Sequence, residues 1–204
     1  MSPLSRFTSR LAFSISAASS PFVVTALTAA IMVWSLGPSL AQLALWGAIT
    51  VLFSAVIPFI IVFGLWRTGK VTDIHVAVRE QRTVPFVAAL VSAALGVVLL
   101  QIVGAPPQLV AIGAAFLVNG AALAGITSRW KISMHSAVLS GCIIALGLVV
   151  TPRLLILLAA LPVVLWARHY RQRHTLAQGI VPILLVSALT PAVYLGAMKV
   201  LGGR

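Results

Sequence analysis

Long apolar runs occupy most of this chain and limit it to a membrane-spanning fold. They lie at about residues 21–37, 41–65, 85–104, 107–128, 133–151, 153–167 and 179–201. About 20 apolar residues in a helix cross the hydrocarbon core of a bilayer, so the first and sixth runs are short and the sixth must use flanking residues. The runs do not alternate as barrel strands do. The sequence therefore predicts an all-α, polytopic membrane bundle of six to seven transmembrane helices, forming one membrane domain over residues 1–204.

Short interruptions separate the runs. Three breaks, at residues 37–38, 104–107 and 151–152, contain proline and predict tight turns because proline cannot continue a helix. Residues 1–20 form a basic N-terminal segment that contains Arg6 and Arg10. The tripeptide Ser39-Leu-Ala could serve as a signal cleavage site, but hydrophobicity resumes at once. We therefore expect an uncleaved first span rather than a signal peptide.

The few charged residues are strongly unbalanced. Only 8% of the 204 residues are charged, and 14 Lys and Arg against 2 Asp and Glu give a net charge of +12. In a soluble protein this excess would indicate nucleic-acid binding. Here the basic residues stand at the ends of apolar runs without interleaved aromatic residues, which is typical of topology signals and of an anion site. We expect the bilayer as partner and no nucleic acid, in an integral protein of a bacterial cell membrane.

Ionisable side chains suited to acid–base chemistry gather in three loops, at about residues 67–83, 129–135 and 168–178. We call these loops the first, second and third islands. Together they contain all four histidines and both carboxylates of the chain, Asp73 and Glu80. Each island follows the previous one by two crossings, so all three emerge on the same membrane face. Topology and residue types therefore predict one composite site.

The distribution of basic residues is a guide to which membrane face carries the islands. Eleven of the fourteen Lys and Arg lie on the island side, the N-terminus included. The positive-inside rule then favours the cytoplasm. About five of the eleven could be present for chemistry, and without them the excess is small, so both faces stay open.

The residue types in the islands indicate phosphate chemistry without a metal. Enzymes that ionise diphosphates through magnesium need several carboxylates, and this chain has two. The four histidines show no paired motif such as H-x-x-x-H, so we expect no metal site and no cofactor. Arginine matches phosphate oxygens, while one neutral histidine can attack phosphorus and a second can protonate the leaving oxygen.

The spacing of polar residues in the second and third islands follows a specific pattern. The third contains Arg168, five residues, His174, three residues and Gln178; the second contains Ile-Ser133-Met-His135. This pattern resembles the motifs S-R-x5-H-x3-D and P-S-G-H of the type 2 phosphatidic acid phosphatase superfamily. The order and spacing of the islands also agree with that family. The resemblance covers roughly residues 67–178 and implies its helical membrane fold.

The first island matches the family's remaining motif, K-x6-R-P, least closely. Lys70 lies nine positions before Arg79, and Thr83 follows Arg82 where the family has proline. The resemblance nevertheless implies a set of cations and polar groups around the substrate phosphate. The expected members are Arg168, Ser133, Arg79 or Arg82, and Lys131 or Lys70.

The resemblance also implies the catalytic roles. His174 would be the nucleophile that forms a phosphohistidine, and His135 the general acid for the departing alcohol. Gln178 stands where the family has aspartate. Its carbonyl can accept a hydrogen bond from the ring and fix the tautomer, but it cannot stabilise an imidazolium as a carboxylate does. Met134 replaces the family's glycine and would crowd an approaching phosphate.

The two carboxylates of the first island have two open interpretations. Asp73 or Glu80 could supply the charge that Gln178 lacks. Alternatively, they could pair with Arg79 and Arg82 and stabilise the loop.

Together these features predict a metal-independent membrane phosphatase acting on a lipid phosphate or prenyl (di)phosphate. Two alternatives stay open. One is a prenyl-diphosphate lyase or cyclase on the same fold, and the other is a non-enzymatic membrane protein that binds anions or lipids.

Overall fold

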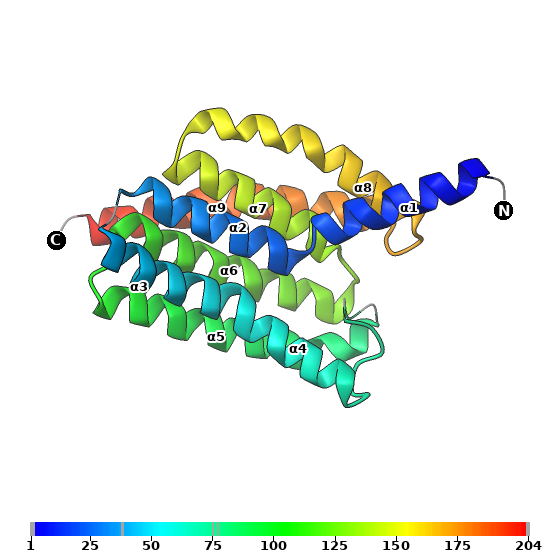
Figure 1. Cartoon of the computed structure of the whole chain (residues 1–204), viewed down its shortest axis with the longest axis horizontal. Helices are drawn as coiled ribbons and strands as arrows, with labels where there is room; N and C mark the ends of the chain where they lie inside the picture. The colour runs from blue at the N-terminus through cyan, green and yellow to red at the C-terminus, as the bar shows by residue number, and fades with distance from the viewer. Residues whose placement is uncertain (1–2, 38, 75, 77, 203–204) are drawn as a thin grey trace.

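The computed structural model describes residues 3–37, 39–74, 76 and 78–202, and this part of the chain is helical without strands. The α-helices are α1 (Pro3–Ala18), α2 (Pro21–Ser35), α3 (Leu40–Val51), α4 (Ile57–Arg67), α5 (Thr83–Ile102), α6 (Pro107–Arg129), α7 (Met134–Val149), α8 (Leu161–Tyr170) and α9 (Leu176–Leu201). A π-helical turn, Leu52–Val56, joins α3 to α4, and 3-10 helices cover Arg79–Arg82 and Pro152–Ala160. The predicted all-α bundle is confirmed (Figure 1).

Several of these helices are long and apolar enough to cross a membrane. Within the described residues there are five, namely Leu40–Arg67, Arg79–Ile102, Pro107–Arg129, Pro152–Tyr170 and Leu176–Leu201. A sixth is reached if α1 and α2, bent by 48° at their junction, count as one span. The chain is therefore an integral membrane protein by length and composition of its helices. All seven predicted runs are helical, but the runs that form α2 and α7 are shorter than a full crossing.

The sixth run is longer than an α-helix with the same number of residues, because part of it is a 3-10 helix. Its first half is the 3-10 helix Pro152–Ala160, and α8 then continues to Tyr170. A 3-10 helix rises about 2.0 Å per residue against about 1.5 Å in an α-helix. The 19 residues of Pro152–Tyr170 therefore extend about 33 Å, enough for a hydrocarbon core of about 30 Å. As expected, the span uses flanking residues, Arg168 among them.

The α7 helix is the most enclosed element and carries His135 in its first turn. It packs against α2 and α9, and the 3-10 helix Pro152–Ala160 lies over its outer side (Figure 1). Gly141 allows α9 to approach closely, because a Cβ there would lie 2.9 Å from Cγ1 of Val186. Close packing on several sides holds the start of α7 in a defined position.

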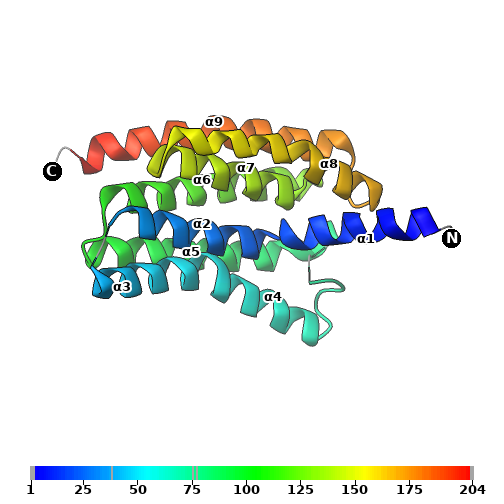
Figure 2. The ribbon, with the colours of Figure 1, turned by 45° about the horizontal axis from the view of Figure 1, so that its top comes forward.

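The connections between helices place all three islands at one end of the bundle. The α5–α6 turn uses Gly104 at a φ of 67°, a left-handed conformation that glycine adopts without steric cost. The predicted turn at Thr151-Pro152 is also observed. Of the predicted turn at residues 37–38, Gly37 is described with a φ of 63°, and Pro38 lies outside the described residues. Figures 1 and 2 show the loops after α4, α6 and α8 at the same end, opposite the α5–α6 turn.

The basic N-terminal segment is a helix, which the sequence interpretation did not predict. α1 packs against α8 and extends beyond the island end of the bundle (Figure 2). The Arg171 guanidinium lies 5.1 Å from the ring centroid of Phe13, a cation–π contact between α1 and the third island. This segment therefore belongs to the folded bundle and lies beside the islands.

Candidate functional site

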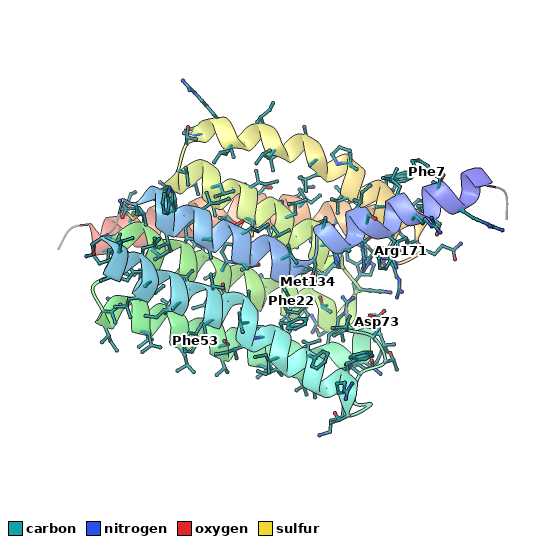
Figure 3. All side chains as sticks on the ribbon, viewed as in Figure 1. Phe7, Phe22, Phe53, Asp73, Met134 and Arg171 are labelled. Atoms are coloured by element: carbon teal, nitrogen blue, oxygen red, sulfur yellow. The ribbon has the colours of Figure 1, made fainter. Side chains whose placement is uncertain are left out.

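A cavity of about 240 Å³ brings residues of all three islands together. Arg82 lines it from the first island, His135 from the second, and Arg168 and His174 from the third. Their exposed fractions are 6%, 4%, 6% and 7%. Four of the predicted site residues thus share one buried space, with both histidines facing it. In Figure 3, Met134 and Asp73 lie toward this end of the bundle, and Phe53 lies further from it.

Arg82 connects the first island to the second. Its Nε donates to the carbonyl oxygen of Val76 at 2.9 Å, and one terminal nitrogen donates to the carbonyl oxygen of Ile132 at 3.0 Å. Val76 has a φ of 45°, a conformation that a β-branched residue seldom adopts. The bond from Arg82 therefore holds a strained stretch of backbone at the edge of the cavity, where Val76 is itself a lining residue.

Two helix N-termini meet beside the cavity. Ser133 caps α7, and Thr175 caps α9 directly after His174. The backbone N–H of Ser133 donates to the carbonyl oxygen of Gln178 at 2.8 Å, which ties the two helix starts together. The N-terminus of a helix carries a partial positive charge, so both helices add to a potential that favours an anion.

Positive charge around the cavity is not balanced by carboxylates. Asp73 pairs with Arg173 at 3.1 Å, and Glu80 pairs with Arg79 at 2.9 Å. These are the two carboxylates of the whole chain. Among the described residues, no ion pair joins Arg82 or Arg168 to a carboxylate, although the negative charge of Asp73 acts on Arg168. The buried Nε of Arg168 has no hydrogen-bond partner in the described part of the chain. An unsatisfied buried donor among several cations favours a bound oxyanion.

His174 is held in its neutral form. Its pKa is lowered from 6.5 to about 3, mainly by burial and in addition by the nearby charges of Arg168, Lys131 and Arg82. The Gln178 side chain opposes the shift, and Nδ1 of His174 is buried without a hydrogen-bond partner in the described chain. The pKa of half-buried Lys131 is lowered by burial and by Arg82, Arg173 and Arg168. An unprotonated imidazole surrounded by cations is suited to attack an anionic phosphorus centre.

We expect His174 to stay neutral from pH 8 to pH 5 in the free protein. With a pKa of about 3 when folded and 6.5 when unfolded, the unfolded chain binds a proton that the folded chain does not. The stability that this difference contributes is complete above about pH 6.5 and is lost as pH falls toward 3. NMR of ¹⁵N-histidine-labelled protein, assigned with His174→Asn, measures the titration directly. A midpoint above pH 6 would contradict this environment, whereas a bound oxyanion should raise the midpoint.

Several predicted residues lie outside the cavity. Arg79 is only partly exposed and does not line the cavity; it donates to the carbonyl oxygens of Ser128 and Arg129 at 3.3 and 2.9 Å. Lys70 is exposed after α4. Ser133 is fully buried, and its hydroxyl accepts from the N–H of Ser136 at 3.5 Å as a helix cap. Of the alternatives left open by the sequence, the structure places Arg82 at the cavity and Lys131 beside His174.

Only one of the two carboxylates follows a sequence interpretation. Glu80 pairs with Arg79 as the loop-stabilising interpretation predicts. Asp73 instead reaches Arg173 of the third island, a connection across 100 positions of sequence. His75, the remaining histidine of the first island, lies outside the described residues.

Gln178 has a structural role that the motif comparison missed. Its side-chain oxygen accepts from the N–H of Thr175 at 3.1 Å, and Oγ1 of Thr175 accepts from the N–H of Gln178 at 3.3 Å. This reciprocal pair is a capping box. The tetrapeptide Thr175-Leu-Ala-Gln178 repeats the pattern of Ser39-Leu-Ala-Gln42, which caps α3 in the same way. The [ST]-x-x-Q spacing was therefore a readable signal for a helix start, and Gln178 both caps α9 and adjoins His174.

Paired substitutions separate these two roles of Gln178. Gln42→Ala and Gln178→Ala should each lower the free energy of unfolding by about 0.5–1 kcal/mol, because each removes half of a capping box. Only Gln178→Ala should lower the pKa of His174 further, and Gln178→Glu should keep the cap while raising that pKa. Thermal unfolding in detergent and histidine NMR provide the two measurements. Equal His174 titrations in all variants would show that Gln178 acts on the helix alone.

Apolar residues form much of the remaining cavity wall, and sequence reasoning did not identify them. They come from helices outside the islands as well as from the islands: Phe22 of α2, Pro58 and Val62 of α4, Phe86 and Leu90 of α5, and Phe116 of α6. Met134, which stands at the family's glycine position, also lines the cavity. The site is therefore polar on the island side and apolar toward the bundle interior.

Within the described residues, no group of three or more His, Cys, Asp or Glu side chains is placed to hold a metal ion. Comparisons of the chain with protein-family models, with curated proteins and with solved structures gave no match. The resemblance to the type 2 phosphatidic acid phosphatase superfamily thus rests on the island residues alone.

Proposed function

We propose that this protein is a metal-independent membrane phosphatase that removes phosphate from a lipid phosphate or prenyl (di)phosphate through a phosphohistidine. The observation that supports it most is the shared cavity, in which two histidines and two arginines are buried together. The neutral state of His174 adds to this support, because a protonated imidazole has no lone pair with which to attack.

The proposed reaction has two displacement steps. The lone pair of His174 attacks phosphorus, the bond from phosphorus to the leaving oxygen breaks, and His135 donates a proton to that oxygen. Water then attacks the phosphohistidine, the phosphorus–nitrogen bond breaks, and His135 takes the proton from water. Arg82, Arg168 and Lys131 balance the charge of the phosphoryl oxygens in both steps.

The position of the cavity supports an amphipathic substrate. It lies where helix ends meet the islands, and its wall changes from arginine and histidine to phenylalanine, leucine and valine. A phosphate at the polar side would leave its attached chain facing apolar side chains. Short loops on this side of the bundle offer little surface for a large soluble group.

Phosphate release from a panel of substrates tests the proposal. Purified protein in detergent with EDTA is given phosphatidate, phosphatidylglycerophosphate, and prenyl mono- and diphosphates. Arg82→Gln and Arg79→Gln form a matched pair, because both residues belong to the same 3-10 helix but only Arg82 lines the cavity.

We expect EDTA-resistant phosphate release that is lost in Arg82→Gln and kept in Arg79→Gln. Activity that EDTA abolishes would argue against the metal-independent mechanism. Diphosphate loss that yields an olefin or ring instead of an alcohol or monophosphate would assign a lyase or cyclase. No phosphate release from any member of the panel would favour the non-enzymatic alternative.

A further inference from the structure

The helices around the cavity of about 240 Å³, here named the island cavity, form a ring with one open side. Residues of α2, α4, α5, α6 and α7 line this cavity together with the islands. Around the ring, α2 packs against α7, α7 against α6, α6 against α5, and α5 against α4. In the part of the chain that the structure describes, no comparable packing joins α4 back to α2. We call the side between α2 and α4 the lateral opening.

The π-helical turn marks the depth at which the ring opens. α2 packs against this turn, Leu52–Val56, and Ser54 in the turn lines the island cavity. The Ser92 hydroxyl donates to the carbonyl oxygen of Phe53 at 2.7 Å, which fixes the turn to α5. From the turn onward α4 leads away from α2, as Figures 1 and 2 show. The wall is therefore closed at the turn and opens toward the islands.

Aromatic rings cover the lateral opening. Phe22 of α2 meets Phe59 of α4 edge to face, with 5.3 Å between the ring centroids, and Figure 3 shows Phe22 between the two helices. Phe59 stacks on Phe63 at 6.0 Å, and Phe63 contacts Trp66 at 5.7 Å. Phe22 lines the island cavity, while Phe59 is 37% exposed on the surface of a span. One layer of side chains thus separates the cavity from the surrounding hydrocarbon, and exposed side chains change rotamer rapidly.

The first island forms the edge of the lateral opening on the water side and connects it to the polar part of the cavity. Val62 of α4 and Val76 of the island belong to one buried cluster, against which Phe22 and Ile74 pack. Arg82 donates from Nε to the carbonyl oxygen of Val76 at 2.9 Å. A phosphate bound at Arg82 would therefore lie beside the lateral opening.

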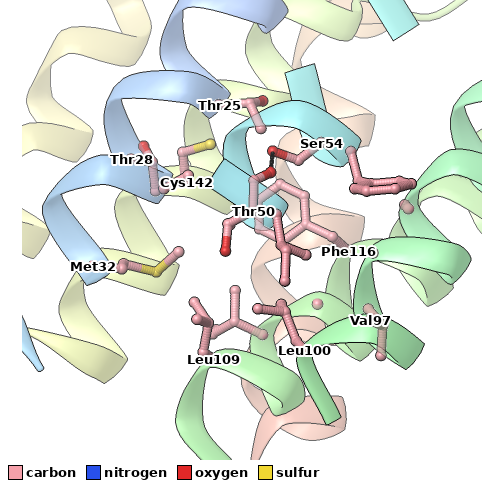
Figure 4. A pocket seen from close by; sticks show the side chains of 17 residues that line it. Thr25, Thr28, Met32, Thr50, Ser54, Val97, Leu100, Leu109, Phe116 and Cys142 are labelled. Atoms are coloured by element: carbon pink, nitrogen blue, oxygen red, sulfur yellow. Dashed lines mark hydrogen bonds between the residues drawn. The ribbon is translucent and has the colours of Figure 1, made fainter. Parts of the chain in front are cut away.

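The bundle interior offers the attached chain no comparable room. A second cavity, of about 70 Å³, shares lining residues with the island cavity on its inner side (Figure 4). A space of this size holds only a few methylene groups. Side chains close against the glycines of its wall: a Cβ at Gly96 would lie 2.7 Å from Cβ of Phe53, and one at Gly113 would lie 2.5 Å from Cγ2 of Val97. A lipid chain of ordinary length must therefore leave the island cavity laterally.

We propose that the hydrocarbon part of the substrate leaves the island cavity through the lateral opening and continues into the bilayer, in contact with Phe22 and Phe59. The proposal rests on the proposed function, which places the phosphate among the two histidines and two arginines of the cavity. It names the substrate class more closely, as a lipid phosphate that stays embedded in the bilayer while its phosphate is in the cavity. Because the bilayer surrounds the rest of the lipid, the bundle interior sets no limit on the number or length of its chains.

A removable cross-link across the lateral opening tests this route without requiring turnover. Phe22→Cys and Phe59→Cys are combined with Cys142→Ser, because Cys142 is the one cysteine of the chain. A short bis(methanethiosulfonate) joins the two new thiols, and a reducing agent releases it. Binding of hexadecyl phosphonate and of methyl phosphonate is measured in nanodiscs before and after release. Each single-cysteine variant, treated with the same reagent, is the matched control.

We expect the cross-link to weaken hexadecyl phosphonate binding by at least about tenfold and to change methyl phosphonate binding by less than about twofold. Reduction should restore the lost affinity, and the single-cysteine controls should bind both ligands as the reduced protein does. Equal hexadecyl phosphonate binding with and without the cross-link would overturn the proposal, and so would an equal loss for both ligands.

A second measurement tests a rival route and decides the matter if the double-cysteine variant does not fold. An apolar groove of about 500 Å³ runs along α4 and α5, and Val87 lines this groove but not the island cavity. Phe59→Trp and Val87→Trp each add a tryptophan to one of the two routes. A hexadecyl phosphonate brominated near its phosphonate should quench the added fluorescence in Phe59→Trp, and orthovanadate should reverse this by competition. No reversible quenching there, or reversible quenching in Val87→Trp instead, would overturn the proposal.

The route and the proposed function fail in different ways. Selective loss of hexadecyl phosphonate binding in the cross-linked protein, without phosphate release from any lipid phosphate, would remove the proposed function and support the route. Phosphate release from a lipid phosphate that the cross-link leaves unchanged would remove the route and keep the proposed function.

Discussion

His174→Ala should abolish phosphate release, with a loss in kcat of at least about 10⁴-fold, because the phosphorus nucleophile is removed. His174 is the member of the cavity whose pKa, at about 3, keeps the ring unprotonated at neutral pH. Its position directly before the cap of α9 fixes the ring where Arg168, Lys131 and Arg82 surround it. The measurement is phosphate release by the variant against wild-type protein, with the substrate that the panel identifies.

Two additional observations separate a nucleophile from a structural histidine. His169→Ala is the matched control, since His169 is an exposed histidine of the same island, and it should keep wild-type activity. Added imidazole should restore part of the activity of His174→Ala by entering the space left in the cavity. Rapid quenching of His135→Asn should reveal an acid-labile phosphoprotein that is missing when His174 is also replaced. Full activity in His174→Ala would remove it from the mechanism.

Arg168→Met should make the protein more stable and unable to bind oxyanions. Arg168 is 6% exposed, its Nε has no partner among the described residues, and neither carboxylate of the chain forms an ion pair with it there. The charge of Asp73 offsets the burial of this cation only in part, so replacing it by an apolar side chain of similar length should raise the free energy of unfolding by about 1–3 kcal/mol. The same change removes two or more charge-assisted hydrogen bonds to phosphate, so activity should fall about 10²-fold or more.

Thermal unfolding with and without orthovanadate measures both effects together. Vanadate should stabilise the wild type, by about 2.7 kcal/mol at 100 times its dissociation constant, and leave Arg168→Met unchanged. Arg171→Met is the control, since Arg171 is half-buried in the same loop but does not line the cavity. A less stable Arg168→Met that still responds to vanadate would show that Arg168 supports the fold and does not bind the anion.

Arg79 and Arg82 show why the candidate site could be only partly predicted. Both are arginines of one short helix, and the motif comparison gave them equal standing. Arg82 is turned inward because two carbonyl oxygens, of Val76 and Ile132, accept its hydrogen bonds. Arg79 is turned outward to the end of α6 and to Glu80. On an ideal 3-10 helix, residues three positions apart lie on the same face, so helix geometry alone would not separate Arg79 from Arg82. Here the carbonyl oxygens of distant residues decided which of the two side chains faces the cavity.

The Gln178 position shows a different limit. Motif spacing made it a counterpart of a catalytic aspartate, and the capping pattern in the tetrapeptide Thr175-Leu-Ala-Gln178 was overlooked. The observed capping box is one of two with the same tetrapeptide pattern among the residues that the structure describes. Local hydrogen bonding therefore explains this glutamine without reference to catalysis, and its effect on His174 is an addition to that role.

The sequence by itself determined the helical membrane bundle and the common end of the three islands. Both follow from local and one-dimensional properties: a bilayer accepts only backbones that satisfy their own hydrogen bonds, and the number of crossings sets the side on which a loop emerges. Only the tertiary structure decided that α1 is part of the bundle, that Arg82 and not Arg79 reaches the cavity, and that apolar residues from helices outside the islands complete its wall. These outcomes depend on the packing of side chains from helices far apart in the chain, such as Phe22, Ala93 and Phe116, and no periodicity in the sequence records those contacts.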